Sequence, residues 1–123
     1  MTNGNTIVTI TPDVIELRGY IDDNGNKRFA AWLESLDAAA AAKVTIALAR
    51  MEQGNFSSVK GVGSGVFEYK IDFGPGYRIY FGKDGESIVI LIGGGTKKRQ
   101  QQDIAAAREC WAAYKQRKKQ ETQ

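Results

Sequence analysis

Hydrophobic and charged side chains alternate over residues 67–73, in the middle of the chain. This period of two predicts a β-strand with one buried face and one polar face. Gly74-Pro75-Gly76 predicts a short hairpin loop, after which residues 77–81 return as the next strand. A second turn leads into an apolar strand over residues 87–92, and three glycines at 93–95 are expected to end the sheet. The segment therefore predicts a three-stranded antiparallel meander.

The hairpin loop also predicts how the first two strands of the meander pair, with Phe73 opposite Tyr77. The pairs that follow are Ile71 with Ile79 and Tyr69 with Phe81 on the buried face, and Asp72 with Arg78 and Lys70 with Tyr80 on the polar face. We expect the polar face to be exposed to solvent. It then presents five side chains: Glu68, Lys70, Asp72, Arg78 and Tyr80.

Two helices are predicted before the meander. Apolar side chains recur at helical spacing over residues 27–36, which predicts a short amphipathic helix. These side chains are Phe29, Trp32, Leu33 and Leu36. Asp37 is a good N-cap for a second helix, which Gly54-Asn55 ends. We expect the two helices to pack as an antiparallel hairpin on one face of the sheet.

Further elements are predicted toward the two ends of the chain. Residues 14–21 predict a first strand, and residues 7–10 predict either a short additional strand or a loose arm. After the meander, four residues spaced three or four apart predict a final helix that begins near Lys98 and docks on the rest of the domain. These residues are Ile104, Ala107, Trp111 and Tyr114.

The composition limits the chemistry that is open to the chain. It has 123 residues, no histidine and one cysteine, so we expect no internal disulfide, no metal site and no cofactor. We expect a single domain over residues 1–123, with a possible arm at 1–13 and a basic tail at 116–123. The chain has no apolar run that could span a membrane and no signal-peptide layout at its N-terminus, which favours a cytoplasmic protein.

Positive charge is concentrated toward the C-terminus. Residues 1–96 contain 9 Lys and Arg against 11 Asp and Glu, whereas residues 97–123 contain 8 against 3. A basic segment of this kind attracts polyanions. The alternative interpretation is a solvated helical face with a basic tail.

Several cations are predicted to lie close together beside the polar face of the hairpin. Lys97, Lys98 and Arg99 follow the end of the last strand, where the glycines allow the backbone to turn closely. Cations and a tyrosine without histidine suit the cleavage of an RNA phosphodiester. Arginine stabilises the charge of a pentacovalent phosphate, lysine or tyrosine can move protons, and the 2′-hydroxyl of the RNA is the nucleophile.

A purely structural interpretation of the same residues is also open. Glu68 with Lys70, and Asp72 with Arg78, are then surface ion pairs, each contributing at most about 1 kcal/mol to stability. The glycines that precede Lys97 lack the spacing of a nucleotide-binding phosphate loop, so nucleotide binding is not expected.

Five segments of the chain occur in the order and spacing of a known family: residues 29–36, 54–56, 65–81, 91–97 and 100–104. With the Gly-Pro-Gly-Tyr-Arg turn at their centre, they resemble the RelE/ParE superfamily of bacterial toxin–antitoxin modules, in the branch of addiction-module killer proteins. The resemblance implies an α+β, RelE-like fold, with a twisted antiparallel β-sheet, an N-terminal helical hairpin and a C-terminal helix. It also implies a cytoplasmic toxin that a cognate antitoxin holds inactive, and the antitoxin is expected to be acidic where it meets the basic C-terminal segment.

Two activities are known in this superfamily. RelE-type members cleave mRNA on the ribosome with cationic residues and no metal, and ParE-type members inhibit DNA gyrase by protein contact. The resemblance thus implies a ribosome-dependent endoribonuclease (an mRNA interferase) that inhibits translation, with ribosome and mRNA as partners. The alternatives are a gyrase inhibitor without enzymatic activity and a decayed member that only binds its antitoxin.

The resemblance also implies roles for individual residues. Arg78 is expected to stabilise the transition state, and Lys70 to act as base for the 2′-hydroxyl. Lys97 matches the lysine that follows the family's glycine pair, and Lys98 with Arg99 is expected to serve as acid or phosphate clamp. Lys70 stands where arginine is usual in the branch, which keeps the charge but loses bidentate geometry. Thr96 stands where aspartate is usual. The expected catalytic residues are Lys70, Arg78, Tyr80, Lys97 and Lys98, and the expected RNA-binding residues are Arg99, Gln100 and Arg108.

Overall fold

The computed structural model describes residues 14–121. The expected arm at 1–13, including residues 7–10, lies outside the described residues. In chain order the elements are β1 (Glu16–Gly19), α1 (Arg28–Glu34), α2 (Ala38–Glu52), β2 (Val59–Gly61), β3 (Phe67–Ile71), β4 (Tyr77–Asp84), β5 (Ile88–Thr96), the 3₁₀ turn η1 (Lys97–Arg99) and α3 (Gln100–Glu121).

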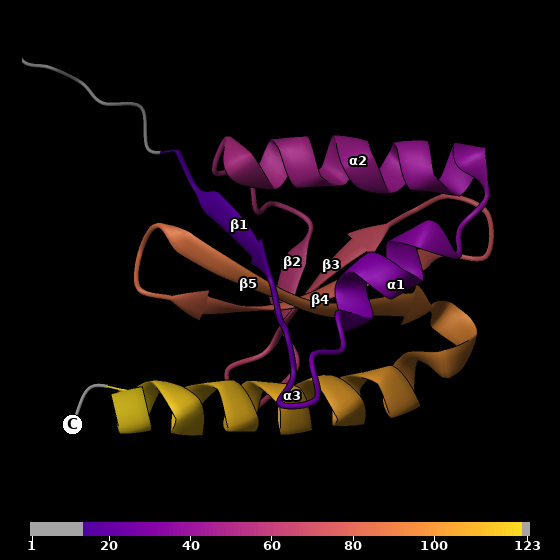
Figure 1. Ribbon diagram of the computed structural model, residues 1–123. Helices are drawn as coiled ribbons and strands as arrows, with labels where there is room; N and C mark the ends of the chain where they lie inside the picture. Colours follow the sequence, from indigo (N-terminus) through magenta and orange to yellow (C-terminus); the bar gives the residue numbers. More distant parts are fainter. Residues whose placement is uncertain (1–13, 122–123) are drawn as a thin grey trace, which may run out of the picture.

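The strands form one five-stranded sheet in the order β1-β5-β4-β3-β2. Helices α1 and α2 lie on one side of it and α3 lies on the other, so the sheet is the middle of three layers (Figure 1). The predicted α+β class, with two N-terminal helices on one face and a C-terminal helix, is confirmed. One detail differs, because β1 pairs with β5 in parallel rather than antiparallel.

Helix α2 begins and ends where its capping residues predict. Asp37 accepts a hydrogen bond from the backbone N–H of Ala40 at 2.8 Å, which satisfies one of the free donors at the start of α2. Gly54 follows the helix with a φ of +82°, the left-handed geometry that ends many helices. Trp32 and Leu33 of α1, like the apolar stripe of α2, pack on the sheet.

The prediction that one face of the hairpin is exposed is wrong for Glu68, Arg78 and Tyr80, which are buried, whereas Lys70 and Asp72 are exposed as expected. Phe81, Ile79 and their neighbours form a core with α1 and α2, as expected from the alternation. Part of the opposite face is buried as well, where α3 covers it with Ile104, Ala107 and Trp111. The second core consists of these three residues with Tyr20, Val66, Tyr80, Ile90 and Ile92.

The hairpin register differs from the predicted one by two residues. Ile71, not Phe73, is the last residue of β3 to pair, and it lies opposite Tyr77, so the loop spans residues 72–76. A shift of two keeps every side chain on its expected face but changes its partner. Lys70 therefore lies opposite Arg78, and Glu68 lies opposite Tyr80.

The three glycines at 93–95 do not end the sheet, because they belong to β5 and pair with β4. A side chain at Gly94 would overlap the indole of Trp32, and one at Gly95 would overlap the carboxyl of Asp103. The glycines therefore let α1 and α3 approach the two faces of the same strand. Strand β2 was not predicted, since it has only three residues.

We expect Gly94→Ala to lower the free energy of unfolding by about 1–3 kcal/mol, because its methyl group would overlap the Trp32 ring. Gly93→Ala is the matched control, since a Cβ at that position meets nothing within 4 Å. Urea denaturation of both variants and the parent protein measures the difference. Equal stability of the two variants would show that α1 does not pack against Gly94.

Candidate functional site

A cleft of about 560 Å³ opens on the α3 side of the sheet, at the point where α3 begins. Its walls come from β2, β3 and β4, from the loop before β2, and from the junction of η1 with α3. The residues that line it are Ser57, Ser58, Val59, Lys60, Glu68, Lys70, Arg78, Lys97 and Gln100.

The strand register places the basic side chains of the cleft. Lys70 of β3 lies directly opposite Arg78 of β4, and Lys60 of β2 lies opposite Glu68 of β3. Like charges directly opposite each other on neighbouring strands are destabilising. The Lys70 and Arg78 pair is therefore a feature that stability does not explain, and a bound anion would relieve it.

Glu68 is the buried carboxylate of the cleft, with a side chain that is 1% exposed. The Nε2 group of Gln100 donates a hydrogen bond to its Oε2 at 2.9 Å. Its Oε1 lies 3.7 Å from Nε of Arg78 and 3.8 Å from Nζ of Lys60. The predicted ion pair between Asp72 and Arg78 is wrong, since Glu68 is the acidic partner of Arg78.

The Gly-Pro-Gly loop links Arg78 to Lys97. The carbonyl oxygen of Gly76 accepts a hydrogen bond from the Lys97 backbone N–H at 2.9 Å and one from Nη1 of Arg78 at 3.4 Å. A Cβ at Gly76 would lie 3.1 Å from Nη1 of Arg78, and the φ of Gly76 is +80°. Glycine is thus required both for the turn and for the close approach of the guanidinium.

Arg78 retains hydrogen-bonding capacity although its side chain is only 5% exposed. Its Nε group is buried and makes no hydrogen bond within the described chain. This nitrogen lies 3.7 Å from Oε1 of Glu68, so it belongs to the buried ion pair and not to the open side of the cleft. A phosphate at the mouth of the cleft would contact the remaining nitrogens of the guanidinium.

Tyr80 lies on its expected face of the sheet, but it is buried there rather than exposed. It is 1% exposed beneath α3, and its hydroxyl has no hydrogen-bond partner in the described chain. Burial raises the pKa of Tyr80, and the carboxylates of Glu68 and Asp103 raise that pKa further. The Tyr80 hydroxyl therefore stays protonated near neutral pH, contrary to the lowered pKa that a proton-transfer role needs.

Four predicted residues lie outside the lining of the cleft: Tyr80, Lys98, Arg99 and Arg108. Lys98 and Arg99 are exposed on η1, next to Lys97. Arg108 lies two turns along α3, where its Nε donates to the carbonyl oxygen of Val62 at 2.9 Å. The structure thus brings together Lys70, Arg78, Lys97 and Gln100 from the predicted set.

Much of the C-terminal positive charge has partners elsewhere on the protein. Nη2 of Arg117 lies 2.7 Å from Oδ1 of Asp23, and Nζ of Lys118 lies 3.4 Å from Oδ2 of Asp84. These pairs hold the last turns of α3 against the rest of the fold. Lys60, by contrast, is a cleft residue that the sequence did not indicate, because β2 has only three residues, none of them buried, and such a strand shows no alternation.

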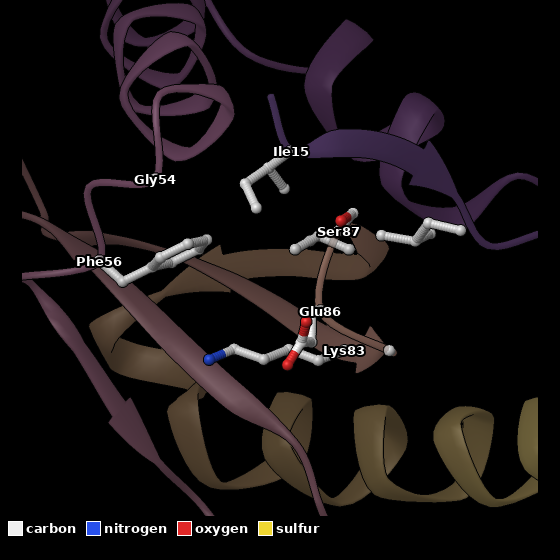
Figure 2. Close-up of a pocket in the computed structure, with 9 residues that line it drawn as sticks. Ile15, Gly54, Phe56, Lys83, Glu86 and Ser87 are labelled. Atoms are coloured by element: carbon white, nitrogen blue, oxygen red, sulfur yellow. The ribbon is translucent and has the colours of Figure 1, made fainter. Parts of the chain in front are cut away.

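A second cavity, of about 550 Å³, lies at the other end of the sheet beside Ile15 and Phe56 (Figure 2). Figure 2 shows Lys83 extended below Phe56, and its Nζ lies 5.2 Å from the centre of the Phe56 ring. Nζ also lies 4.8 Å from the Phe67 ring centre. This cation packs on aromatic rings, and Glu86 is its charged neighbour in the lining, so the cavity gathers no set of cations.

Within residues 14–121, no three His, Cys, Asp or Glu side chains are arranged to hold a metal ion. None of the helices in that range combines the length and the apolarity needed to cross a membrane.

Cys110 of α3 is partly buried, and this burial raises the pKa of its thiol. A raised pKa disfavours the reactive thiolate.

The chain has recognisable relatives. Residues 31–118, from within α1 to near the end of α3, match the family described as phage-derived protein Gp49-like (DUF891). An uncharacterized protein of Haemophilus influenzae is 41% identical over 65 residues, which are 52% of this chain and 66% of that protein. The match therefore leaves about a third of the relative's length uncovered. The family match covers most of the chain, including helix α3 and the strands that build the cleft. The chain therefore belongs to the Gp49-like family, a toxin-like family of toxin–antitoxin modules.

Proposed function

We propose that the protein is the toxin of a toxin–antitoxin pair and that it cleaves mRNA on the ribosome. The observation that carries the proposal is the cleft in which Lys70 and Arg78 lie opposite each other, with Lys97 and Lys60 on its walls. A site that contains several cations binds anionic ligands, such as the phosphates of RNA. Membership of a toxin-like family supports a role against a cellular target.

The proposed reaction needs no water nucleophile. The 2′-hydroxyl of a ribose attacks the adjacent phosphorus, the bond to the 5′-oxygen breaks, and the products are a 2′,3′-cyclic phosphate and a free 5′-hydroxyl. Arg78 stabilises the negative charge that builds on the phosphate oxygens. Lys70, as its neutral amine, takes the proton of the 2′-hydroxyl, and Lys97, held beside Arg78 by Gly76, donates a proton to the leaving oxygen.

The remaining residues have supporting roles in this proposal. Glu68 and Gln100 fix the position of Arg78, and buried Tyr80 packs beneath the same site on β4. Lys98 and Arg99, exposed on η1, extend the positive surface along which RNA approaches. The antitoxin is proposed to present an acidic segment that covers the cleft and neutralises it.

We expect Arg78→Ala to lower the rate of mRNA cleavage by about 10²–10³-fold, because it removes the group that stabilises the transition state. Lys70→Ala is expected to lower the rate as well. The measurement is primer extension on mRNA from translating ribosomes incubated with purified protein, together with growth after expression without antitoxin. Lys27→Ala is the matched control, since Lys27 lies at the β1 side of the sheet and lines a different groove.

Arg78→Lys separates loss of chemistry from loss of folding. It keeps a charge near Glu68 but loses the planar guanidinium, so we expect a folded protein with strongly reduced cleavage. Thermal denaturation establishes that each variant is folded. If folded Arg78 and Lys70 variants cleave mRNA and arrest growth as the parent does, the assignment of the site is wrong.

DNA gyrase is expected to be unaffected by the protein. The measurement is supercoiling of relaxed plasmid by gyrase, with and without purified protein, at concentrations that stop translation. Full supercoiling at those concentrations agrees with the proposal. Inhibition of gyrase, with mRNA left intact on ribosomes, would replace the proposed function by that of a gyrase inhibitor.

A further inference from the structure

A second basic cleft adjoins the first one. It has a volume of about 320 Å³ and lies between α2 and the end of β3. The residues that line it are Lys43, Ile46, Ala47, Arg50, Ser58, Tyr69, Lys70, Ile71, Asp72 and Phe73. Ser58 and Lys70 line both clefts, so the two form one continuous groove.

The groove crosses the edge of the sheet at the point where β2 begins. The first residue of β2, Val59, pairs with Tyr69, and the Lys70 backbone N–H still reaches the carbonyl oxygen of Ser58 at 3.4 Å. Beyond this point β3 has no neighbouring strand on that side. The groove therefore passes from the α3 side of the sheet, over the edge at Lys70, to the α2 side.

The joined groove is strongly basic. Six basic and two acidic side chains line it, so its formal charge of +4 exceeds the +3 of the whole chain. On the α2 side Nζ of Lys43 lies 5.2 Å from the centre of the Phe73 ring, which holds this cation at the wall. Arg50 is exposed in the last turn of α2, and Asp72 is the acidic residue of this half.

We propose that the second cleft binds the single-stranded RNA that flanks the scissile phosphate, with Lys43 and Arg50 contacting its phosphates. The inference rests on the proposed function, because a polymer cleaved beside Arg78 must continue beyond the first cleft. The adjoining basic path begins at Lys70. A path that turns over a sheet edge suits a flexible single strand and excludes a stiff duplex.

The test is binding of oligouridylates that carry 2′-O-methyl groups and so resist cleavage, measured by fluorescence anisotropy. Oligomers of about 4 and about 12 nucleotides are compared, because one fills only the first cleft and the other reaches both. The Lys43→Gln/Arg50→Gln variant is expected to bind the longer oligomer about 5–10-fold more weakly and the shorter one unchanged. The slope of log affinity against log salt should fall by about 1.4 for the longer oligomer.

Two further variants sharpen the result. Asp72→Asn is expected to tighten binding of the longer oligomer only, because it removes the acidic group of the second cleft. Lys27→Ala, at the opposite side of the sheet, should change neither affinity. Thermal denaturation controls for folding, and a polyglutamate peptide serves as a probe for an acidic protein partner.

The outcomes separate this inference from the proposed function. Unchanged binding of the longer oligomer by the Lys43→Gln/Arg50→Gln variant overturns the inference, whatever the parent does to mRNA on ribosomes. The inference is also overturned if the same variant binds polyglutamate more weakly and the longer oligomer unchanged. The second cleft would then bind an acidic protein instead of RNA. If this variant loses affinity for the longer oligomer while the parent protein leaves mRNA intact on ribosomes, the RNA path stands and the proposed function fails.

Discussion

The carboxylate of Glu68 and the guanidinium of Arg78 meet inside the protein, with side chains 1% and 5% exposed. Removing one partner of a buried ion pair costs about 3–5 kcal/mol, because the other charge is left uncompensated. Gln100, the first residue of α3, donates a hydrogen bond to the same carboxylate, so the start of the helix is fixed relative to β3. The turn η1 directly precedes Gln100, and Lys97 is consequently held beside the pair. The contact that joins helix to sheet is therefore also the contact that builds the cleft.

Charge is distributed in this protein in two different ways. Arg117 and Lys118 of α3 pair with carboxylates and hold the helix on the fold. Lys70 and Arg78 instead lie opposite each other, an arrangement that costs stability and that an anion relieves. Natural proteins tolerate such local costs where function requires them. The uneven charge of the sequence is thus partly structural, and the cleft contains cations from β2, β3, β4 and η1 rather than from the basic tail.

Local patterns predicted the elements well and their surroundings less well. Alternation over β3 placed each side chain on its correct face, and a register error of two residues left those faces unchanged. The pattern could not show that α3, which begins beyond β5, covers the polar face and buries Glu68, Arg78 and Tyr80. The signal for a covered sheet was present in β5, where residues 88–92 are apolar on both faces. The glycines at 93–95 predict a strand end when taken alone, because their role depends on Trp32 and Asp103, which are distant in sequence.

The central claim is that the cleft supplies cations and the substrate supplies its own nucleophile. It is tested most directly with two mRNAs on translating ribosomes, which differ only in a 2′-deoxynucleotide immediately before the scissile phosphate. We expect the all-RNA message to be cut there, leaving a 2′,3′-cyclic phosphate and a 5′-hydroxyl, and the substituted message to stay intact at that position. Cleavage of both messages at equal rates would contradict the assignment of Lys70 and Arg78 to this reaction.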